Sequence, residues 1–370
     1  MAVGIEGFRA DLGSPKLGVG NAVSQGPGAY DRLVMAVRAL GDDARLLEPL
    51  ARAWQGRHFE TAYARPMLLL AAMRYRALEN PDHPLALELL MDAEAPDLDQ
   101  RLLAALADPD LVPVLAARSV QTNEPGRAFA WGLPALTLGL GHRAFDLVDL
   151  GCSAGLNLVV DRTAIPYRFG VNRLAGFDFP SPERRVGLDR APIDLHDEAE
   201  SRWLEACIWP GQPERMERLA ATRDLYRRPW RGDAPAPELL AHELGQGITA
   251  SRIASLGVGL GRTVIVYESV VRPYLEPTAR AHHDADLWGF LAGARDRLWC
   301  VLEPADGGGF PGALVNAAPT SSSHPMTLSL HFVRHGERVS LALAQSAYHA
   351  AACVIVPGAI ALFKELWGAA

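Results

Sequence analysis

Residues 147–158, with the sequence Leu-Val-Asp-Leu-Gly-Cys-Ser-Ala-Gly-Leu-Asn-Leu, constrain the fold more than any other part of the chain. An apolar run stops at Gly151, a turn of small residues follows, and a second apolar segment comes after it. This order predicts a strand, a tight turn and a helix. Ligands of open α/β sheets bind at the carboxyl ends of such strands, where a helix also offers free N–H groups. The segment therefore predicts an α/β sheet with a ligand loop at residues 151–155.

The rest of this half of the chain alternates strands with helices. Short apolar runs predict strands at residues 186–188, 263–267 and 298–302. Helix-like stretches lie at residues 198–208 and 213–221. Such alternation indicates a mostly parallel sheet that is covered on both faces.

The C-terminal part differs from this pattern. Residues 326–333 and 338–343 alternate around His335-Gly336-Glu337, which predicts a β-hairpin. Residues 352–356 predict a further buried strand.

Helical spacing dominates the N-terminal part. Apolar residues recur at helical intervals in residues 30–40, 65–78, 85–91 and 98–106, and β-branched runs are almost absent. We expect an all-helical domain at residues 1–140, followed by an α/β domain at residues 141–370.

Composition excludes several classes of function. The 370 residues carry a net charge of -7, which argues against a dedicated nucleic-acid binder. The four cysteines form no C-x-x-C pair, so a zinc knuckle and a disulfide scaffold are not expected. The histidines do not cluster at ligand spacing, and we expect no metal. There is no signal-peptide pattern and no unbroken apolar stretch of about 20 residues, so we expect a cytoplasmic protein without membrane contact. The oligomeric state is left open.

Two interpretations of the glycine loop come from familiar motifs. The dinucleotide fingerprint G-x-G-x-x-G fits poorly, because Ser153 and Leu156 stand where glycines belong. The nucleophile elbow G-x-S-x-G fits residues 151–155 and makes Ser153 the nucleophile of a serine hydrolase. Asp306 and either His324 or His331 follow in the required order.

The third interpretation is a site for S-adenosylmethionine. Asp149 precedes the loop by two residues, where a carboxylate suits a cationic ligand but opposes an oxyanion. Asp189 could accept hydrogen bonds from ribose at the end of a second strand, and Asp233 could meet the adenine amino group after a third. Turn or helix-cap roles remain open for both. The expected cofactor-binding residues are Asp149, Gly151, Cys152, Ser153, Gly155, Asn157, Asp189 and Asp233.

The chain resembles an uncharacterised bacterial family, a domain of unknown function whose core is similar to class I S-adenosylmethionine-dependent methyltransferases. Matching pieces lie at residues 121–127, 149–158, 187–194, 206–212 and 232–233. The resemblance spans about residues 30 to 365. It implies a Rossmann-like methyltransferase core with a mostly parallel seven-stranded sheet behind a helical N-terminal extension, but no substrate.

Methyl transfer depends mainly on positioning, with a base where the acceptor must lose a proton. Glu268 and Tyr267, at the end of a predicted strand, are the catalytic candidates, with Tyr274 as a further acceptor contact. The polar residues Gln121, Asn123, Glu124 and Arg127 are substrate-binding candidates. The same run could instead cap a helix through Thr122 or Asn123.

The leading prediction is methyl transfer to a small molecule. A serine hydrolase using Ser153 is the enzyme alternative. A degenerate methyltransferase fold that binds a nucleoside-like ligand or a partner protein without catalysis is the second.

Overall fold

The computed structural model describes residues 2–13, 28–59, 64–121, 123–163, 168–169, 172–173, 179–230, 236–304, 309–316, 324–349 and 352–368. The chain forms two compact units: one comprises Met1–Thr122 and His196–Glu217, the other Asn123–Leu195 and Arg218–Ala370. The limits 1–140 and 141–370 stay a prediction. In the structure, the helical unit also takes up a later segment of the chain.

The first unit is built from helices. They are α1 (Ala2–Leu12), α2 (Ala29–Ala39), α3 (Ala44–Ala53), α4 (Ala64–Glu79), α5 (Ala86–Met91), α6 (Leu98–Leu106), α7 (Leu111–Ala117) and α9 (Glu198–Ala206). The helices predicted at residues 30–40, 65–78, 85–91 and 98–106 are confirmed within one residue at each end.

Helix α9 belongs to this unit because of how it packs. Trp203 is buried and lies 5.8 Å from Tyr75, measured between ring centroids. The guanidinium of Arg74, on α4, donates to the backbone carbonyls of Glu205 and Ile208. Aromatic contact and buried hydrogen bonds thus join α9 to helices that lie more than a hundred residues earlier.

The second unit contains a single sheet. Its strands are β1 (Phe145–Leu150), β2 (Arg168–Phe169), β3 (Asn172–Arg173), β4 (Arg184–Asp189), β5 (Glu238–Ala241), β6 (Thr263–Ser269), β7 (Arg297–Pro304), β8 (Met326–Arg334), β9 (Glu337–Ser346) and β10 (Ala352–Ile355). Their order is β3-β2-β10-β9-β8-β7-β6-β1-β4-β5. The expected α/β class with a mainly parallel sheet is confirmed. The expected seven strands are wrong, because β10, β2 and β3 extend the sheet beyond β9.

Five neighbouring strands, β5-β4-β1-β6-β7, run parallel, and β8 and β9 form an antiparallel hairpin. The predicted hairpin turn is confirmed at His335 and Gly336, which both have positive φ. After the short edge strands β2 and β3, the chain adds β4 and β5 on one side of β1 and then returns to β6 on the other side of β1. Ligands of open sheets bind at the carboxyl ends of the strands where such an order reverses.

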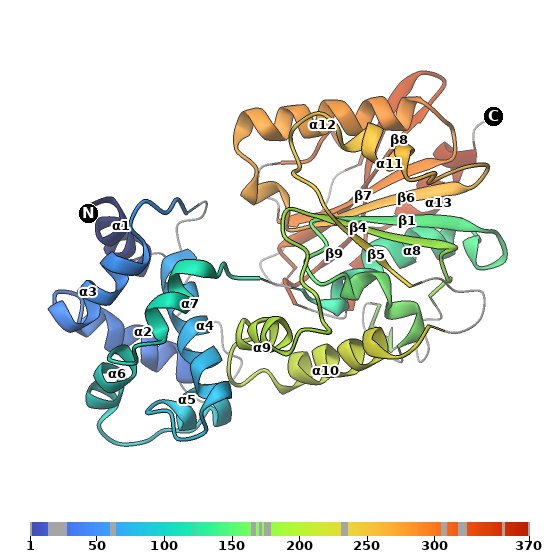
Figure 1. Ribbon diagram of the computed structural model, residues 1–370. Helices are drawn as coiled ribbons and strands as arrows, with labels where there is room; N and C mark the ends of the chain where they lie inside the picture. The colour runs from blue at the N-terminus through green and yellow to red at the C-terminus, as the bar shows by residue number, and fades with distance from the viewer. Residues whose placement is uncertain are drawn as a thin grey trace. The chain divides into compact units, whose positions relative to one another are not determined.

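Helices cover both faces of the sheet. Helices α8 (Phe129–Thr137) and α13 (Ala359–Gly368) pack on one face, and α11 (Thr249–Ser255) and α12 (Pro277–Ala292) pack on the other. Figure 1 shows α11 and α12 on the opposite side of the strands from α8. All six residues of β1 are buried, as expected for a parallel strand between two helical layers. Helix α10 (Pro213–Arg227) contributes residues to both units.

Candidate functional site

The glycine loop follows β1, between the neighbouring strands β4 and β6. Its backbone is left-handed at Gly151 (φ 71°), Ser153 (φ 52°) and Gly155 (φ 68°). Serine would fit the middle position of the loop without strain only with ordinary backbone angles, and Ser153 does not have them. A side chain at positive φ is strained, and such strain is concentrated at functional sites.

The predicted helix after the loop is wrong. Two short 3₁₀ segments take its place, η4 (Leu156–Leu158) and η5 (Val160–Arg162). The indole N–H of Trp131 donates to the carbonyl of Asn157 at 3.0 Å, and Arg185 donates to the carbonyl of Leu158 at 2.7 Å. Side chains from distant parts of the chain thus donate to these carbonyls, which in an α-helix would accept from backbone N–H groups of the next turn.

Protein atoms fill the space beside the glycines. A Cβ at Gly151 would lie 2.5 Å from Cγ2 of Val271, and one at Gly155 would lie 2.7 Å from Cδ2 of Leu239. A Cβ at Gly187 would lie 2.6 Å from Sγ of Cys152. The loop thus needs its glycines for left-handed turns and close packing within the protein.

Asp189 and Asn123 fix the loop from two sides. The carboxylate of Asp189, at the end of β4, accepts hydrogen bonds from the backbone N–H groups of Ser153 and Ala191, both at 2.9 Å. The side-chain amide of Asn123 donates to the carbonyl of Cys152 at 2.7 Å. Asp189 therefore shapes the loop, and its contact with a ribose stays a prediction.

Asp149 is the most unusual group of the site. It is 2% exposed, and no hydrogen bond or ion pair joins its carboxylate to any residue in the described parts of the chain. Asp146, on the same strand, is equally buried but accepts from the N–H of Gly259 at 2.7 Å and from Arg262 at 2.9 Å. Burial, and then the charge of Asp189, raise the pKa of Asp149 well above its usual range.

More polar atoms near Asp149 are buried without a hydrogen-bond partner. Tyr267 lies opposite Asp149 in the pairing of β6 with β1, and its hydroxyl has no well-oriented partner within the described structure. Burial, and then Asp149, raise the pKa of Tyr267, while the neighbouring side chain of Ser269 and then the charge of Arg127 lower it. The phenol is therefore neutral and can donate a hydrogen bond, and the charges of Asp149 and Arg127 both act on it. On and beside the glycine loop, the buried side-chain oxygens Asn123 Oδ1, Ser153 Oγ and Asn157 Oδ1 also lack a hydrogen-bond partner.

This composition favours a ligand that brings hydrogen-bond donors or a positive charge. Carboxylate and amide oxygens accept only, and hydroxyls can do either. A buried acceptor that stays unpaired costs free energy, so several together indicate a partner from outside the chain.

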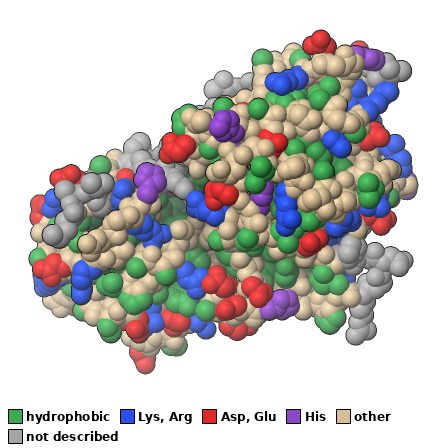
Figure 2. All heavy atoms as spheres, turned by 45° about the horizontal axis from the view of Figure 1, so that its top comes forward, with side chains coloured by type: hydrophobic (Ala, Val, Ile, Leu, Met, Phe, Trp, Pro, Cys, Tyr) green, Lys and Arg blue, Asp and Glu red, His purple; other side chains and the backbone are tan. Residues whose placement is uncertain are grey.

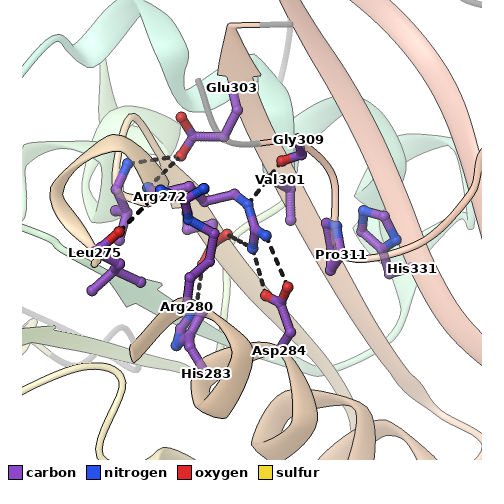
Figure 3. A network of polar contacts seen from close by, with 12 residues as sticks. Arg272, Leu275, Arg280, His283, Asp284, Val301, Glu303, Gly309, Pro311 and His331 are labelled. Atoms are coloured by element: carbon purple, nitrogen blue, oxygen red, sulfur yellow. Dashed lines mark hydrogen bonds and ion pairs between the residues drawn. The ribbon is translucent and has the colours of Figure 1, made fainter. Parts of the chain in front are cut away.

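Glu268 lies on the opposite face from Tyr267, because consecutive residues of a strand point to opposite sides. It is fully buried beneath α12, where Oε2 lies 2.8 Å from His283 Nε2 and Oε1 lies 3.7 Å from Arg272 Nη1. Figure 3 shows this network beside Glu303. The two catalytic candidates are thus brought to different sides of the sheet.

The substrate-binding candidates divide as well. Gln121 belongs to the helical unit, where its N–H donates to Cys207 Sγ at 3.5 Å. Asn123 binds the glycine loop, Glu124 accepts from the N–H of Gly126 at 3.1 Å, and Arg127 donates to the carbonyl of Tyr348 at 2.9 Å.

Glu124, and not Asn123, supplies the side-chain cap of this run. Thr122 lies outside the described residues. Tyr274, in η6 (Arg272–Tyr274), is 42% exposed.

Sequence reasoning missed two residues close to this site. Burial, and then the neighbouring Cys152 thiol, raise the pKa of Tyr226 to about 12, so this α10 side chain lies close enough to the glycine loop to interact with it. Arg218, also on α10, donates to Glu124 at 3.0 Å and to the carbonyl of His349 at 3.0 Å. The helix is rich in charged residues, so its sequence does not single out these two.

Residues 21–354 match a family described as "Uncharacterized protein conserved in bacteria (DUF2332)". The chain belongs to this family. The match includes both the polar run at residues 121–127 and the glycine loop. No curated protein matches the chain. Because the family description names no activity, a function for this DUF2332 protein has to be argued from the site.

Two predicted site residues fall outside the described structure. Asp233 is one, and the sheet strand in this region, β5, begins after it at Glu238. The expected contact of Asp233 with an adenine amino group stays a prediction. Asp306, the acid of the hydrolase alternative, is the other.

His331 is held in the core of the α12 face. Its ring nitrogens lie 2.8 Å from the hydroxyls of Ser329 and Ser340. Burial, and then Arg272, lower its pKa to about 3. Both nitrogens are thus engaged away from Ser153.

Neither a membrane-spanning helix nor a cluster of metal ligands occurs in the described residues of this DUF2332 chain. None of the helices described is long and apolar enough to cross a membrane. No group of three or more His, Cys, Asp or Glu side chains in the described ranges is arranged to hold a metal ion. Figure 2 shows acidic and basic side chains interspersed over the displayed face.

Proposed function

We propose that this protein binds S-adenosylmethionine at the carboxyl ends of β1, β4 and β6 and transfers its methyl group to a small molecule. The observation that carries the proposal is the buried, unpartnered carboxylate of Asp149 beside the glycine loop. A cationic ligand compensates such a charge, whereas a forming oxyanion would be repelled by it. The serine hydrolase alternative has no comparable support.

The strand order supports the proposal. The five parallel strands are arranged as 3-2-1-4-5 in chain order, which is the order of Rossmann-like sheets. The loop after the first of them lies where these sheets bind nucleotide-like ligands. The family resemblance to methyltransferases points to the same loop.

The residues at the loop fit such a ligand. Asp149 would face its positive charge, and the unpartnered oxygens of Ser153 and Asn157 would accept from its amino or hydroxyl groups. When bound, S-adenosylmethionine supplies an electrophilic methyl group on a sulfonium. The side chains hold and orient the reactants and exclude water, which is the main demand of an in-line displacement.

The acceptor side of the site is assigned to Tyr267 and Arg127. Tyr267 keeps its proton, so it can orient an acceptor but does not act as a base. Arg127 is buried and pairs with no carboxylate in the described ranges. It is suited to an anionic group on the acceptor or on the cofactor. Glu268 is left out of the proposed site, because it points to the α12 face.

Calorimetric titration with S-adenosylhomocysteine tests the proposal. Wild type should bind, and Asp149→Asn should bind about 10- to 100-fold more weakly, the usual effect of losing hydrogen bonds to a charged group. Asp146→Asn is the matched control, since it removes a buried charge from the same strand but should leave affinity unchanged. Absence of wild-type binding at millimolar ligand would refute the proposal.

Two further measurements separate the alternatives. Labelling of Ser153 by a fluorophosphonate probe would favour the hydrolase. Binding of S-adenosylhomocysteine without methyl transfer to any acceptor in a broad panel would favour the non-catalytic protein.

A further inference from the structure

The turn that follows β6 is strained. Val270 has a φ of 56°. The left-handed region is a true outlier for a β-branched side chain, because Cβ crowds the backbone there. A turn of this kind persists only when its surroundings hold it in place.

Hydrogen bonds from β7 hold this turn. The N–H of Val270 donates to the carbonyl of Leu302 at 3.2 Å. The carboxylate of Glu303 accepts from the N–H groups of Val271 at 2.7 Å and Arg272 at 3.1 Å. Figure 3 shows the Glu303 side chain reaching the backbone at the start of η6. Glu303 therefore caps this segment from the neighbouring strand.

Arg272 fixes the other end of the turn. Its guanidinium donates to both oxygens of Asp284 on α12, at 2.6 and 2.9 Å, and to the carbonyl of Gly309 at 2.9 Å. Glu268 Oε1 lies 3.7 Å from Arg272 Nη1, and His283 in turn lies 2.8 Å from Glu268 Oε2; both side chains are fully buried. Charged groups buried in this way keep their geometry, because moving one leaves another without a partner.

The turn packs directly on the glycine loop. Cγ2 of Val271 lies 2.5 Å from the point where a Cβ on Gly151 would stand. The loop itself begins with the N–H of Gly151 donating to the carbonyl of Leu188 at 2.7 Å. A shift of Val271 would therefore change the packing of the residue that starts the loop.

We infer that Glu303 is a positioning residue: by capping the strained turn at Val270, it holds Val271 against Gly151 and so sets the shape of the ligand loop. Its effect on cofactor affinity rests on the proposed function, whereas its effect on the loop does not. Glu303 lies on the α12 face and acts on the ligand loop only through the turn.

Hydrogen–deuterium exchange of three variants tests the inference. In Glu303→Ala the turn loses its acceptor, so exchange should quicken both at residues 269–273 and at the loop, residues 150–156. In Glu303→Gln the amide oxygen still accepts from both N–H groups, so both segments should exchange as in wild type. Ser329→Ala, which removes a buried hydrogen bond from the same face without touching the turn, is the control.

Affinity for S-adenosylhomocysteine provides the second readout. It should fall about tenfold in Glu303→Ala and be retained in Glu303→Gln. If wild type does not bind, the proposed function fails, while exchange at the loop still decides the inference. Faster exchange confined to the turn, or spread evenly over the whole chain, would overturn it.

Val270→Gly covers the case in which Glu303→Ala does not fold. Glycine accepts the left-handed conformation without strain but loosens the turn. The Val270 side chain also packs against the core, so its removal affects global stability as well. Exchange at residues 150–156 should therefore quicken by more than the change in global stability accounts for. Unchanged exchange at the loop would contradict the inference.

Discussion

Strand β1 carries two buried aspartates that differ in one respect. Asp146, near its amino end, is surrounded by donors from Gly259 and Arg262. Asp149, near its carboxyl end, is 2% exposed, and its buried Oδ2 has no donor among the described residues. Asp146 is therefore a carboxylate that stabilises the fold. Asp149 does not have that role, and it lies where open sheets bind ligands.

The comparison extends to the next strands. Glu268 and Glu303 are also buried at carboxyl ends, but on the α12 face they meet His283, Arg272 and backbone N–H groups. On the α8 face, Asp149 and Tyr267 lack such partners. The two faces therefore differ in charge pairing. On the α12 face the carboxylates lie in a network with Arg272 and His283, although Glu268 Oε1 and Glu303 Oε2 have no hydrogen bond there. On the α8 face, Asp149 has neither a hydrogen bond nor an ion pair among the described residues.

The largest expected effect concerns Glu303 and pH. Burial, and then the charge of Glu268, raise its pKa to about 8. Unfolded glutamate ionises near its ordinary value of about 4.3, so between these values the folded state binds more protons than the unfolded state. Wild-type stability should therefore fall as pH rises through this window, approaching about 1.4 kcal/mol per pH unit.

Urea unfolding of Glu303→Gln over this range checks the sign. The glutamine does not titrate, so the free energy of unfolding of the variant should increase relative to that of wild type as pH rises to about 8. Above this pH the difference between the two proteins should stay constant. Ser329→Ala should follow the wild-type pH dependence throughout. Parallel curves for Glu303→Gln and wild type would mean that the Glu303 carboxyl is not destabilised by burial.

The second effect concerns Asp146. Replacing it by Asn removes the charge that Gly259 and Arg262 bind, and Arg262 is partly exposed, which moderates the loss. We expect the free energy of unfolding to fall by about 2–3 kcal/mol, the cost of losing hydrogen bonds to a charged group. Chemical denaturation at neutral pH measures it. An unchanged free energy of unfolding would show that the donors of Asp146 do not stabilise the fold, and the two aspartates would then not differ in this respect.

The third effect has the opposite sign. Asp149→Asn removes a buried carboxylate without a partner, so we expect the ligand-free protein to gain about 1–2 kcal/mol at neutral pH. Because the pKa of Asp149 is raised, wild-type stability falls as pH rises above the ordinary aspartate range, and the gain should shrink in acid. Thermal unfolding at several pH values, without ligand, provides the measurement. A loss like that of Asp146→Asn would show that Asp149 has a donor.

The sequence identified those parts of the molecule that follow local rules. The helices α4 and α6, the strand β6 and the place of the glycine loop all come from periodicity and turn chemistry. The alternation of a strand also separates Tyr267 from Glu268, and that signal was available from their adjacent numbers.

What could not be predicted depends on contacts between distant residues. The missing helix after the loop depends on Trp131 and Arg185, which engage the carbonyls of Asn157 and Leu158. The sequence also does not show that Asp149 is unpaired, because Asp146 and Asp149 are both flanked by apolar residues. Only the arrangement of the strands decides which aspartate finds a donor.

The smallest effect concerns Ser153, whose place in the loop combines strain with an unpaired hydroxyl. Glycine at this left-handed position relieves the Cβ crowding but adds entropy to the unfolded chain, so Ser153→Gly should gain about 0.5–1 kcal/mol in the ligand-free state. Affinity for S-adenosylhomocysteine should fall about 2- to 10-fold if the hydroxyl binds the ligand, because one neutral hydrogen bond is lost. Ser153 would then act as Asp149 does, with a smaller effect: it destabilises the ligand-free protein and stabilises the complex with the ligand. Thermal unfolding and calorimetry on the same samples measure both signs. A variant that gains stability and binds as wild type would restrict the ligand contact of Ser153 to its backbone.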